Sequence, residues 1–180
     1  MILLFTGNGK GKTTSAIGQA IRVIGQGRRV AFFQFIKSKK WPSGEDSSLL
    51  RFGKSLKFFK GGKGFVGIMG DKLPFYVHER AAKETLKKAK KFIFSKKYGL
   101  VVLDEINVAL SLKLLNLKDV LKLIRALRQA QGKQKKEMDL ILTGRNAPRT
   151  LIKIADLVTE FKEIKHPFSK GIQGKRGREY

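Results

Sequence analysis

Thr6-Gly7-Asn8-Gly9-Lys10-Gly11-Lys12-Thr13-Thr14 directly follows an apolar run, residues 1–5, and precedes a segment with helical periodicity. A strand, a glycine-rich loop and a helix in this order predict a phosphate-binding loop. The alternating glycines let successive backbone N–H groups converge, and the helix adds the positive end of its dipole. A standard G-x-x-x-x-G-K-[ST] loop would have glycine at position 6, so this loop begins one residue late.

Two side chains of the loop have predicted chemical roles. Lys12 would bring a cation to the outer phosphates of a nucleoside triphosphate, and the Thr13 hydroxyl would ligate the accompanying Mg²⁺. The residues predicted to bind the nucleotide are Gly7, Asn8, Gly9, Lys10, Gly11, Lys12, Thr13 and Thr14.

The composition limits the class of protein. A chain of 180 residues with 42% hydrophobic content predicts one globular domain, residues 1–180. No apolar run approaches membrane-spanning length and no signal segment precedes the first strand, so we expect a cytoplasmic protein without a membrane partner. The absence of cysteine excludes disulfides, thiolate metal sites and a cysteine nucleophile.

The net charge of +25, from 39 Lys+Arg against 14 Asp+Glu, would attract phosphates, nucleic acid or other anions. Many of the lysines occur on predicted helix faces, as in residues 83–91, which favours a solvated basic surface. Aromatic residues are not interleaved with these clusters as stacking platforms would require. A nucleic-acid partner is therefore not expected.

Apolar strands alternate with amphipathic helices along the whole chain. The expected elements are a helix from the loop to Gly25, a strand 30–36, a loop 37–48, a glycine-rich stretch 53–70 whose aromatics something should cover, a helix after Pro74, a strand 99–103, a helix capped by Asn116, a strand 138–143, a helix 148–155 and a strand 157–164. This order predicts a single-domain α/β P-loop NTPase (RecA-like) fold with a mainly parallel sheet flanked by helices. Ligands would gather at the carboxyl ends of the strands, where the loops carrying Lys12, Trp41, Glu105 and Arg145 should lie.

The run Leu100-Val101-Val102-Leu103-Asp104-Glu105 has the form of a Walker B strand, which delivers carboxylates to Mg²⁺. The predicted metal ligands are therefore Thr13, Asp104 and Glu105. Alternatively, an acidic residue at the end of a strand caps the following helix. If the strand persists through Glu105, the two carboxylates point in opposite directions and only one contacts the metal.

Three further polar residues have weaker signals. Arg145 could bind a phosphate through its planar, bidentate guanidinium, or could form a surface ion pair. His78 and His166 have no metal-ligand spacing and no paired acid in the sequence, so a structural role is favoured for both.

Taken together, these segments resemble the P-loop corrinoid adenosyltransferases, which attach the adenosyl group of ATP to cobalt in vitamin B12 synthesis and salvage. The matching segments span almost the whole chain: TGNGKGKTT (6–14), QFIK (34–37), WPSGE (41–45), GF (64–65), VVLDE (101–105), TGR (143–145), KH (165–166) and the closing Tyr180.

The resemblance implies a function and a set of site residues. ATP would lie in reversed orientation, with its ribose C5′ facing the cobalt(I) of a reduced corrinoid. Such a reaction needs no protein base but needs alignment, exclusion of water, and charge stabilisation of the departing triphosphate. Lys12 and Arg145 would act catalytically on the triphosphate. Phe65 would lie at the lower face of the corrin and exclude an axial ligand, and Trp41 is a further expected binding residue.

The sequence departs from the family pattern after Phe65. Family members commonly continue with Thr-Trp, whereas this chain has Val66-Gly67, so a second aromatic is missing. Either Phe65 acts with another residue such as Phe58, Phe59 or Trp41, or the reduction of cobalt is less efficient in this chain. Many members also have an N-terminal extension over the partner's active site, which the residues before the first strand here cannot form; a homodimer and a flavoprotein electron donor are expected as partners.

Two other functions use the same motifs. In a RecA-like ATPase acting on nucleic acid, Glu105 would activate water, and the basic surface would suit a polyanion. A P-loop kinase would need an Arg-rich lid helix, which the sequence does not show. The bond of ATP that breaks separates these functions, because hydrolysis and phosphoryl transfer release ADP whereas adenosyl transfer releases triphosphate.

Overall fold

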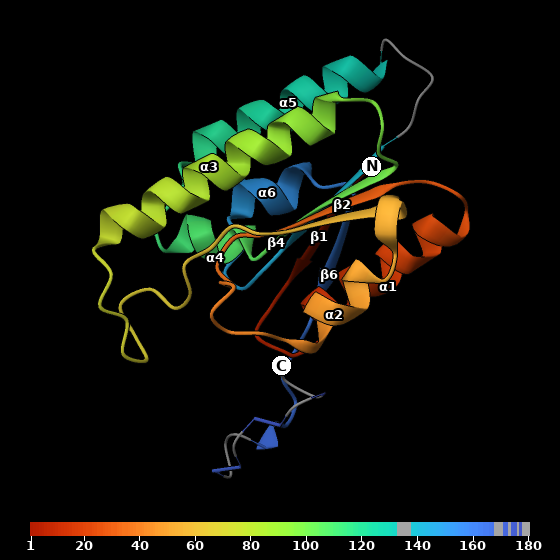
Figure 1. The fold of residues 1–180 in the computed structure, drawn as a ribbon. Coiled ribbons are helices and arrows are strands. Elements are labelled where there is room, and N and C mark those ends of the chain that lie inside the picture. Colours follow the sequence, from red (N-terminus) through yellow and green to blue (C-terminus); the bar gives the residue numbers. More distant parts are fainter. Residues whose placement is uncertain (133–137, 168–170, 173, 176, 178–180) are drawn as a thin grey trace.

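The computed structural model describes residues 1–132, 138–167, 171, 172, 174, 175 and 177. Its centre is a six-stranded sheet with the order β3-β2-β4-β5-β1-β6 (Figure 1). The strands are β1 (Ile2–Thr6), β2 (Val30–Gln34), β3 (Leu56–Lys60), β4 (Leu100–Asp104), β5 (Asp139–Thr143) and β6 (Leu157–Glu160). Every neighbouring pair is parallel, so the carboxyl ends of all six strands meet at one edge of the sheet.

Helices cover both faces of this sheet (Figure 1). The helices α1 (Lys12–Gly25) and α2 (Gly44–Leu50) pack on one face, and α3 (Phe75–Phe94), α4 (Ile106–Ser111), α5 (Leu117–Gly132) and α6 (Arg149–Ile154) pack on the other. Strand β2 is apolar without interruption as far as Phe33, because both of its faces are covered by helices. Phe33 faces the α3 side and Phe32 faces the α1 side, and both are fully buried. The predicted P-loop NTPase (RecA-like) α/β fold is confirmed.

The predicted loop 37–48 is wrong from Gly44 onward, because α2 begins there. Its start is a local hydrogen-bonded motif in which an Asp46 carboxylate oxygen accepts from the Ser43 backbone N–H at 2.9 Å. The short helix α4 was also not predicted. It begins directly after β4, because Glu105 turns the chain with a left-handed φ of 62°.

The glycine-rich stretch 53–70 contains a short 3₁₀ helix (Gly53–Ser55) and the edge strand β3, neither of which was predicted. The expectation that its aromatics are covered is confirmed for Phe59, which stacks on Phe33 at 4.8 Å between ring centroids, with the Lys88 ammonium 3.8 Å from its centroid. It is wrong for Phe65, which is exposed. Gly61 and Gly62 permit close packing: a Cβ at Gly62 would lie 2.1 Å from the Ile36 carbonyl oxygen. These glycines serve packing rather than flexibility.

Two strands end two or more residues earlier than predicted, whereas the predicted cap of one helix is present. The last strand ends at Glu160 rather than at residue 164, and β2 ends at Gln34 rather than at 36. The predicted cap of α5 is confirmed, because the Asn116 side-chain oxygen accepts from the Lys118 N–H at 2.8 Å. Tyr180, which contributed to the resemblance, lies outside the described residues.

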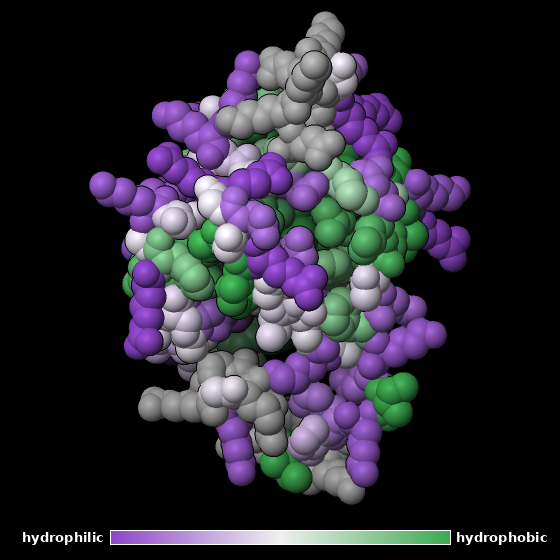
Figure 2. Space-filling model, turned by 90° about the vertical axis from the view of Figure 1, so that its right-hand side faces the viewer, coloured by the Kyte–Doolittle hydropathy of each residue, from purple (hydrophilic) through white to green (hydrophobic). Residues whose placement is uncertain are grey.

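The molecular surface is strongly polar. The lysines of α3 at positions 83, 87, 88, 90 and 91 are all exposed, as predicted for a solvated basic face. Figure 2 shows hydrophilic side chains projecting around one face of the molecule, with hydrophobic residues between them. Within the described part of the chain, no helix is both long and apolar enough to cross a membrane.

Candidate active site

The phosphate-binding loop lies between β1 and α1, at the carboxyl edge of the sheet. Gly7 and Gly11 have φ values of 96° and 116°, which only glycine adopts readily, and Gly11 is the residue from which α1 begins. Thr6 remains in β1, and its hydroxyl accepts a hydrogen bond from the Ala147 N–H at 3.3 Å. Because the loop begins one residue late, position 6 holds a threonine, and its hydroxyl connects β1 to the loop after β5.

A distant part of the chain also requires these glycines. The Gly9 N–H donates to the Phe161 carbonyl oxygen at 2.6 Å, so the segment after β6 passes directly over the loop. A Cβ at Gly7 would lie 2.4 Å from that oxygen, and one at Gly9 would lie 2.7 Å from the Lys162 carbonyl. The spacing of glycines thus serves backbone packing as well as curvature, which the sequence alone did not show.

Gly9→Ala is expected to displace this segment and lower ATP affinity by about 100-fold, because the added methyl meets backbone atoms that cannot rotate away. Gly18→Ala is the matched control: Gly18 lies within α1 with open space around it, so alanine should raise helix stability by about 0.5–1 kcal/mol and leave ATP affinity unchanged. Calorimetric ATP titration measures both variants. Equal affinities for the two variants would contradict the packing argument.

Lys12 occupies the first turn of α1 and is buried. Its ammonium donates to the Gly9 carbonyl oxygen at 2.6 Å, which holds the side chain folded over the loop. Burial lowers the pKa of Lys12, and the neighbouring Glu105 carboxylate partly offsets this. The ammonium is therefore directed at the loop's interior, where a phosphate would bind.

Asp104, the last residue of β4, is completely buried and accepts hydrogen bonds from three other elements. The Thr13 and Thr143 hydroxyls donate to one carboxylate oxygen at 2.9 and 2.7 Å, and the Gln34 amide donates to the other at 3.1 Å. Burial raises the pKa of Asp104. This contact brings two of the three predicted metal ligands together.

Glu105 is the third predicted ligand, and its side chain lines the same cleft as Lys12. Because β4 stops at Asp104 and Glu105 adopts a left-handed conformation, the two carboxylates need not point in opposite directions as they would along a continuing strand. Glu105 stands at the N-cap position of α4 without making a side-chain cap. Burial, followed by the nearby Asp104 carboxylate, raises the pKa of Glu105 to about 7.

These groups fit a magnesium ion. One hydroxyl and two carboxylates are the hard oxygen ligands that Mg²⁺ prefers. Mg²⁺ usually takes only one or two carboxylates from the protein and fills its other positions with phosphate oxygens and water. Among the described residues, no group of three His, Cys, Asp or Glu could hold a metal by itself. The protein therefore offers a partial set of ligands, which the phosphates of a nucleotide would complete.

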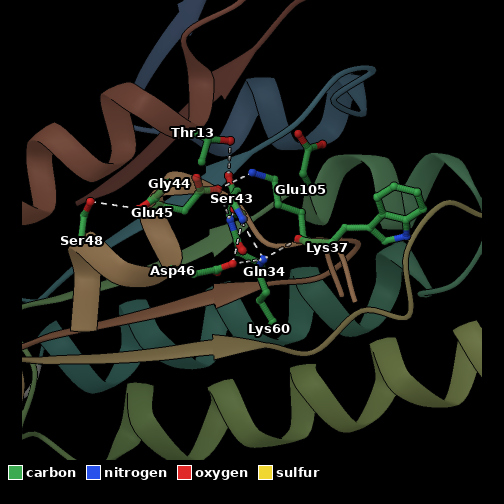
Figure 3. A network of polar contacts seen from close by, with 12 residues as sticks. Thr13, Gln34, Lys37, Ser43, Gly44, Glu45, Asp46, Ser48, Lys60 and Glu105 are labelled. Carbon is green, nitrogen blue, oxygen red and sulfur yellow. Dashed lines mark hydrogen bonds and ion pairs between the residues drawn. The ribbon is translucent and has the colours of Figure 1, made fainter. Parts of the chain in front are cut away.

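A polar network that the sequence did not predict connects this centre to α2 (Figure 3). The Gln34 amide that bonds Asp104 also lies 3.3 Å from a Glu45 carboxylate oxygen, and Glu45 forms an ion pair with Lys37. Gln34 and Lys37 belong to the QFIK segment, and Glu45 belongs to the WPSGE segment. Burial acts to raise the pKa of Glu45, but the hydrogen bond and charge of Lys37 outweigh it and lower the pKa to about 2.

Glu45→Gln is expected to lower the free energy of unfolding at pH 7 by roughly 2 kcal/mol. The wild-type carboxylate has a depressed pKa, so its contribution is fully present above its ordinary value of 4.5 and is lost as pH falls through about 2. Urea unfolding from pH 7 downward should show the two proteins converging below that ordinary value. Glu79→Gln, which removes a partner from an exposed pair with Lys83, should change stability little at any pH.

Arg145 projects from the turn after β5. Gly144 has a φ of 125°, and a Cβ there would lie 3.1 Å from the backbone nitrogen of Val108. The Asn107 amide donates to the Gly144 carbonyl oxygen at 3.2 Å. This packing against α4 directs the exposed Arg145 into the cleft, where it faces the Lys12 side.

The phosphate-binding loop forms one wall of a cleft of about 700 Å³, within the usual range for small-molecule sites. Lys12, Glu105 and Arg145 line it together, as expected. Other lining residues were quoted in the motifs without an assigned role or were regarded as structural: Lys37, Glu45 and His166. Only folding brings them together, although their positions after strand ends were a usable signal.

Trp41 and Phe65 lie in a second cleft of about 250 Å³, not among the residues lining the first. Their rings meet edge to face, with centroids 6.2 Å apart. One wall is the loop 67–73, in which the Asp71 carboxylate accepts from the Gly67 and Leu73 N–H groups at 2.9 and 3.1 Å.

The two histidines have different surroundings. His78, on α3, is buried with its Nε2 atom 2.9 Å from an Asp71 carboxylate oxygen, so a paired acid exists that the sequence did not reveal. This contact fixes the loop 67–73 to α3, in keeping with the structural role predicted for His78. His166 instead lines the larger cleft.

The sequence of this chain matches one protein family over its whole length. The model of the family described as ATP:corrinoid adenosyltransferase BtuR/CobO/CobP matches residues 1–180. A corrinoid adenosyltransferase from Sinorhizobium sp. is 36% identical over 181 residues, covering 100% of this chain and 80% of the relative. Corrinoid adenosyltransferases from Pseudomonas aeruginosa and Escherichia coli K12 are 36% and 32% identical over 180 residues, covering 100% of this chain and 83% and 85% of the relatives.

Among solved structures, the flagellar accessory protein FlaH from Methanocaldococcus jannaschii superposes with a TM-score of 0.52. It is 13% identical, and the match covers 88% of this chain and 69% of that chain, so it supports the fold alone. The family match over all residues, together with relatives of which this chain covers 80–85%, is decisive for the assignment. This chain belongs to the ATP:corrinoid adenosyltransferase family.

Proposed function

We propose that this enzyme transfers the 5′-deoxyadenosyl group of ATP to the cobalt(I) of a corrinoid and releases triphosphate. The cobalt electron pair forms a bond to C5′ of the ribose, and the bond between C5′ and the triphosphate oxygen breaks. Family membership supports this reaction. The structural observation that carries it is a phosphate-binding cleft that shares the segment 37–45 with a second cleft lined by two exposed aromatic rings.

The leaving group gains negative charge as this bond breaks, and the cations of the first cleft would stabilise it. Lys12 would contact the phosphates from within the loop, and Arg145 would contact them from the opposite wall. Magnesium, held by Thr13, Asp104 and Glu105, would neutralise charge on the phosphate oxygens. The N–H groups of the loop and the start of α1 would complete the triphosphate site.

The second substrate would bind beside this cleft. Phe65 is 40% exposed at its edge, and we infer that its ring contacts the lower face of the corrin. That contact would keep water from the axial position of cobalt. Cobalt(II) binds an axial ligand, and cobalt(I) does so much less, so excluding the ligand would make the one-electron reduction easier.

Phe65→Ala is therefore expected to slow the reaction that starts from cobalt(II) and a reductant by about 10–100-fold, while cobalt(I) supplied already reduced reacts within about threefold of wild type. ATP affinity should not change, because Phe65 does not line the first cleft. Anaerobic absorbance of the adenosylated product measures both reactions. Equal losses from cobalt(I) and cobalt(II) would contradict the axial role.

The decisive experiment identifies the products of ATP. Purified protein, Mg²⁺, ATP and a chemically reduced corrinoid are incubated without oxygen, and the nucleotide products are separated by ion exchange. We expect adenosylated corrinoid and triphosphate in equal amounts, formed only when the reduced corrinoid is present. ADP and phosphate released in response to DNA or RNA, with no cobalt–carbon product, would instead support a nucleic-acid-dependent ATPase.

A flavoprotein electron donor and a homodimer stay predictions from the resemblance, and a cytoplasmic location stays a prediction from the composition. The exposed lysines of α3 give an acidic donor a surface of opposite charge. Gel filtration with light scattering would determine the oligomeric state.

A further inference from the structure

The three aromatic residues that could replace the missing second aromatic after Phe65 have different surroundings in the structure. Phe58 packs against Phe32 in the core, with ring centroids 6.0 Å apart, and Phe59 is enclosed by Phe33 and Phe92. Trp41 is 60% exposed and is in contact with Phe65. Of the three, only Trp41 presents a free aromatic surface at the second cleft.

We propose that Trp41 is the second aromatic contact for the corrinoid in this chain and that Lys60 is the residue that positions it. This inference rests on the proposed function, because it assigns a role in binding the same second substrate. It concerns residues outside the phosphate-binding cleft, so it can be tested separately from ATP binding.

Gly64 and Phe65 are the neighbours of the indole ring of Trp41. A Cβ at Gly64 would lie 3.8 Å from the Cδ1 and Nε1 atoms of Trp41, so the indole edge faces this glycine with room for about one methyl group between them. Gly64 is itself fixed, since its N–H donates to the Ile36 carbonyl oxygen at 2.9 Å and its φ is 111°. The interplanar angle of 72° between Trp41 and Phe65 is a favourable edge-to-face geometry. The two rings therefore present one continuous apolar surface.

Lys60 fixes the backbone that carries the indole (Figure 3). Its side chain, on the edge strand β3, is only 4% exposed. The ammonium donates to the Trp41 carbonyl oxygen at 3.0 Å and to an Asp46 carboxylate oxygen at 2.6 Å, and it lies 3.5 Å from the Ser43 hydroxyl. A buried ammonium with three oxygen partners connects the Trp41 turn to the start of α2 and to the sheet.

The same turn lines both clefts. Lys37 and Glu45 line the phosphate-binding cleft, whereas Lys40 and Trp41, between them in sequence, line the second cleft. An apolar macrocycle on the Trp41 and Phe65 rings would thus lie next to bound ATP. The second cleft also has exposed apolar residues on its loop wall, Ile68, Met69 and Leu73.

Two rings cover more of a flat macrocycle than one, so both are needed to keep water from the metal. When cobalt(II) gains one electron from an added one-electron reductant, it gives up its axial ligand. Trp41 and Phe65 would act as a unit in favouring that state, and the effects of losing each should not add.

The first test compares Trp41→Ala, Trp41→Phe, Phe65→Ala and the double alanine variant in the two reactions described above. Trp41→Ala should slow the cobalt(II) reaction by about tenfold or more, change the cobalt(I) reaction by less than about threefold, and leave ATP affinity intact. Trp41→Phe should recover most of the loss. The double alanine variant should be within about twofold of the worse single variant.

The second test examines Lys60 through the fluorescence of Trp41, the only tryptophan in the chain. Lys60→Met should increase acrylamide quenching of that fluorescence and slow the cobalt(II) reaction, and it should slow it no further when Trp41 is already alanine. Lys57→Met is the matched control on the same strand, because Lys57 is exposed and should affect neither property. If Lys60→Met does not fold, Lys60→Gln is measured in its place.

Several outcomes would overturn the inference. A wild-type rate for Trp41→Ala from cobalt(II), or equal losses from cobalt(I) and cobalt(II), would exclude Trp41 as the second aromatic contact. Additive losses in the double variant would show that the rings do not act together. A wild-type protein that forms no product from cobalt(I) and ATP would overturn the proposed function, and this inference with it.

Discussion

Lys12→Ala is expected to abolish adenosyl transfer, reducing the rate by about 10³-fold or more, and to weaken ATP binding by about 100-fold. Lys12 is buried, and its ammonium is held over the phosphate-binding loop by the Gly9 carbonyl oxygen, so its removal leaves this position without a cation. Burial lowers the pKa of its ammonium, and a charge that is shielded from water acts more strongly on a nearby phosphate. Calorimetric titration and the anaerobic assay measure the two effects.

Lys87→Ala is the control for the loss of one positive charge. Lys87 is exposed on α3, so the variant should bind ATP and react as wild type does. If Lys12→Ala kept wild-type ATP affinity, the triphosphate would have to bind elsewhere, and the assignment of the loop would be wrong.

Asp104→Asn is expected to reduce transfer by a similar factor of about 10³ without unfolding the protein. The amide has almost the same shape as the carboxylate but lacks its negative charge, so it would bind Mg²⁺ poorly. The substitution also removes a completely buried carboxylate. The asparagine oxygen can still accept from the Gln34 amide, while its N–H₂ group faces the Thr13 and Thr143 hydroxyls, whose oxygens can accept. The melting temperature should stay within about 4 °C of wild type.

The comparison with added Mg²⁺ makes this prediction specific. Wild-type activity should disappear with a chelator and return with Mg²⁺, whereas the Asp104→Asn variant should remain inactive even at high Mg²⁺ concentration. Full activity of that variant would show that the carboxylate is not a metal ligand. A large fall in melting temperature would show that Asp104 acts mainly in folding.

Much of the architecture could be predicted because its signals are local. Apolar runs identified five of the six strands, helical periodicity identified the three longest helices, α1, α3 and α5, and Pro148 marked the start of the short α6. Strand β3 was missed because Gly61 and Gly62 directly follow it, and these glycines suggested an irregular segment. Helix α4 was missed because it is one short segment that starts at a left-handed residue, Glu105, which no sequence period reveals.

The residues of the candidate site likewise include some that a local motif predicted and some that it did not. Lys12, Thr13 and Asp104 were recognised from short motifs whose spacing reflects the shape of a phosphate or a cation. Gln34 and Glu45 were quoted only as parts of a resemblance, and their contacts with Asp104 and Lys37 were not foreseen. Side-chain networks of this kind depend on rotamers and on neighbours far away in sequence, so no local pattern encodes them.

The sequence by itself determined that this chain forms a phosphate-binding loop, followed by alternating helices and buried strands. The reason is that backbone curvature and hydrophobic periodicity are properties of neighbouring residues. Only the tertiary structure decided which distant residues meet: Thr143 with Asp104, Phe161 with Gly9, and Trp41 with Phe65. The parallel sheet brings the ends of its strands to one edge whatever their separation along the chain, and the order of the strands, which no single segment contains, sets which of them are neighbours.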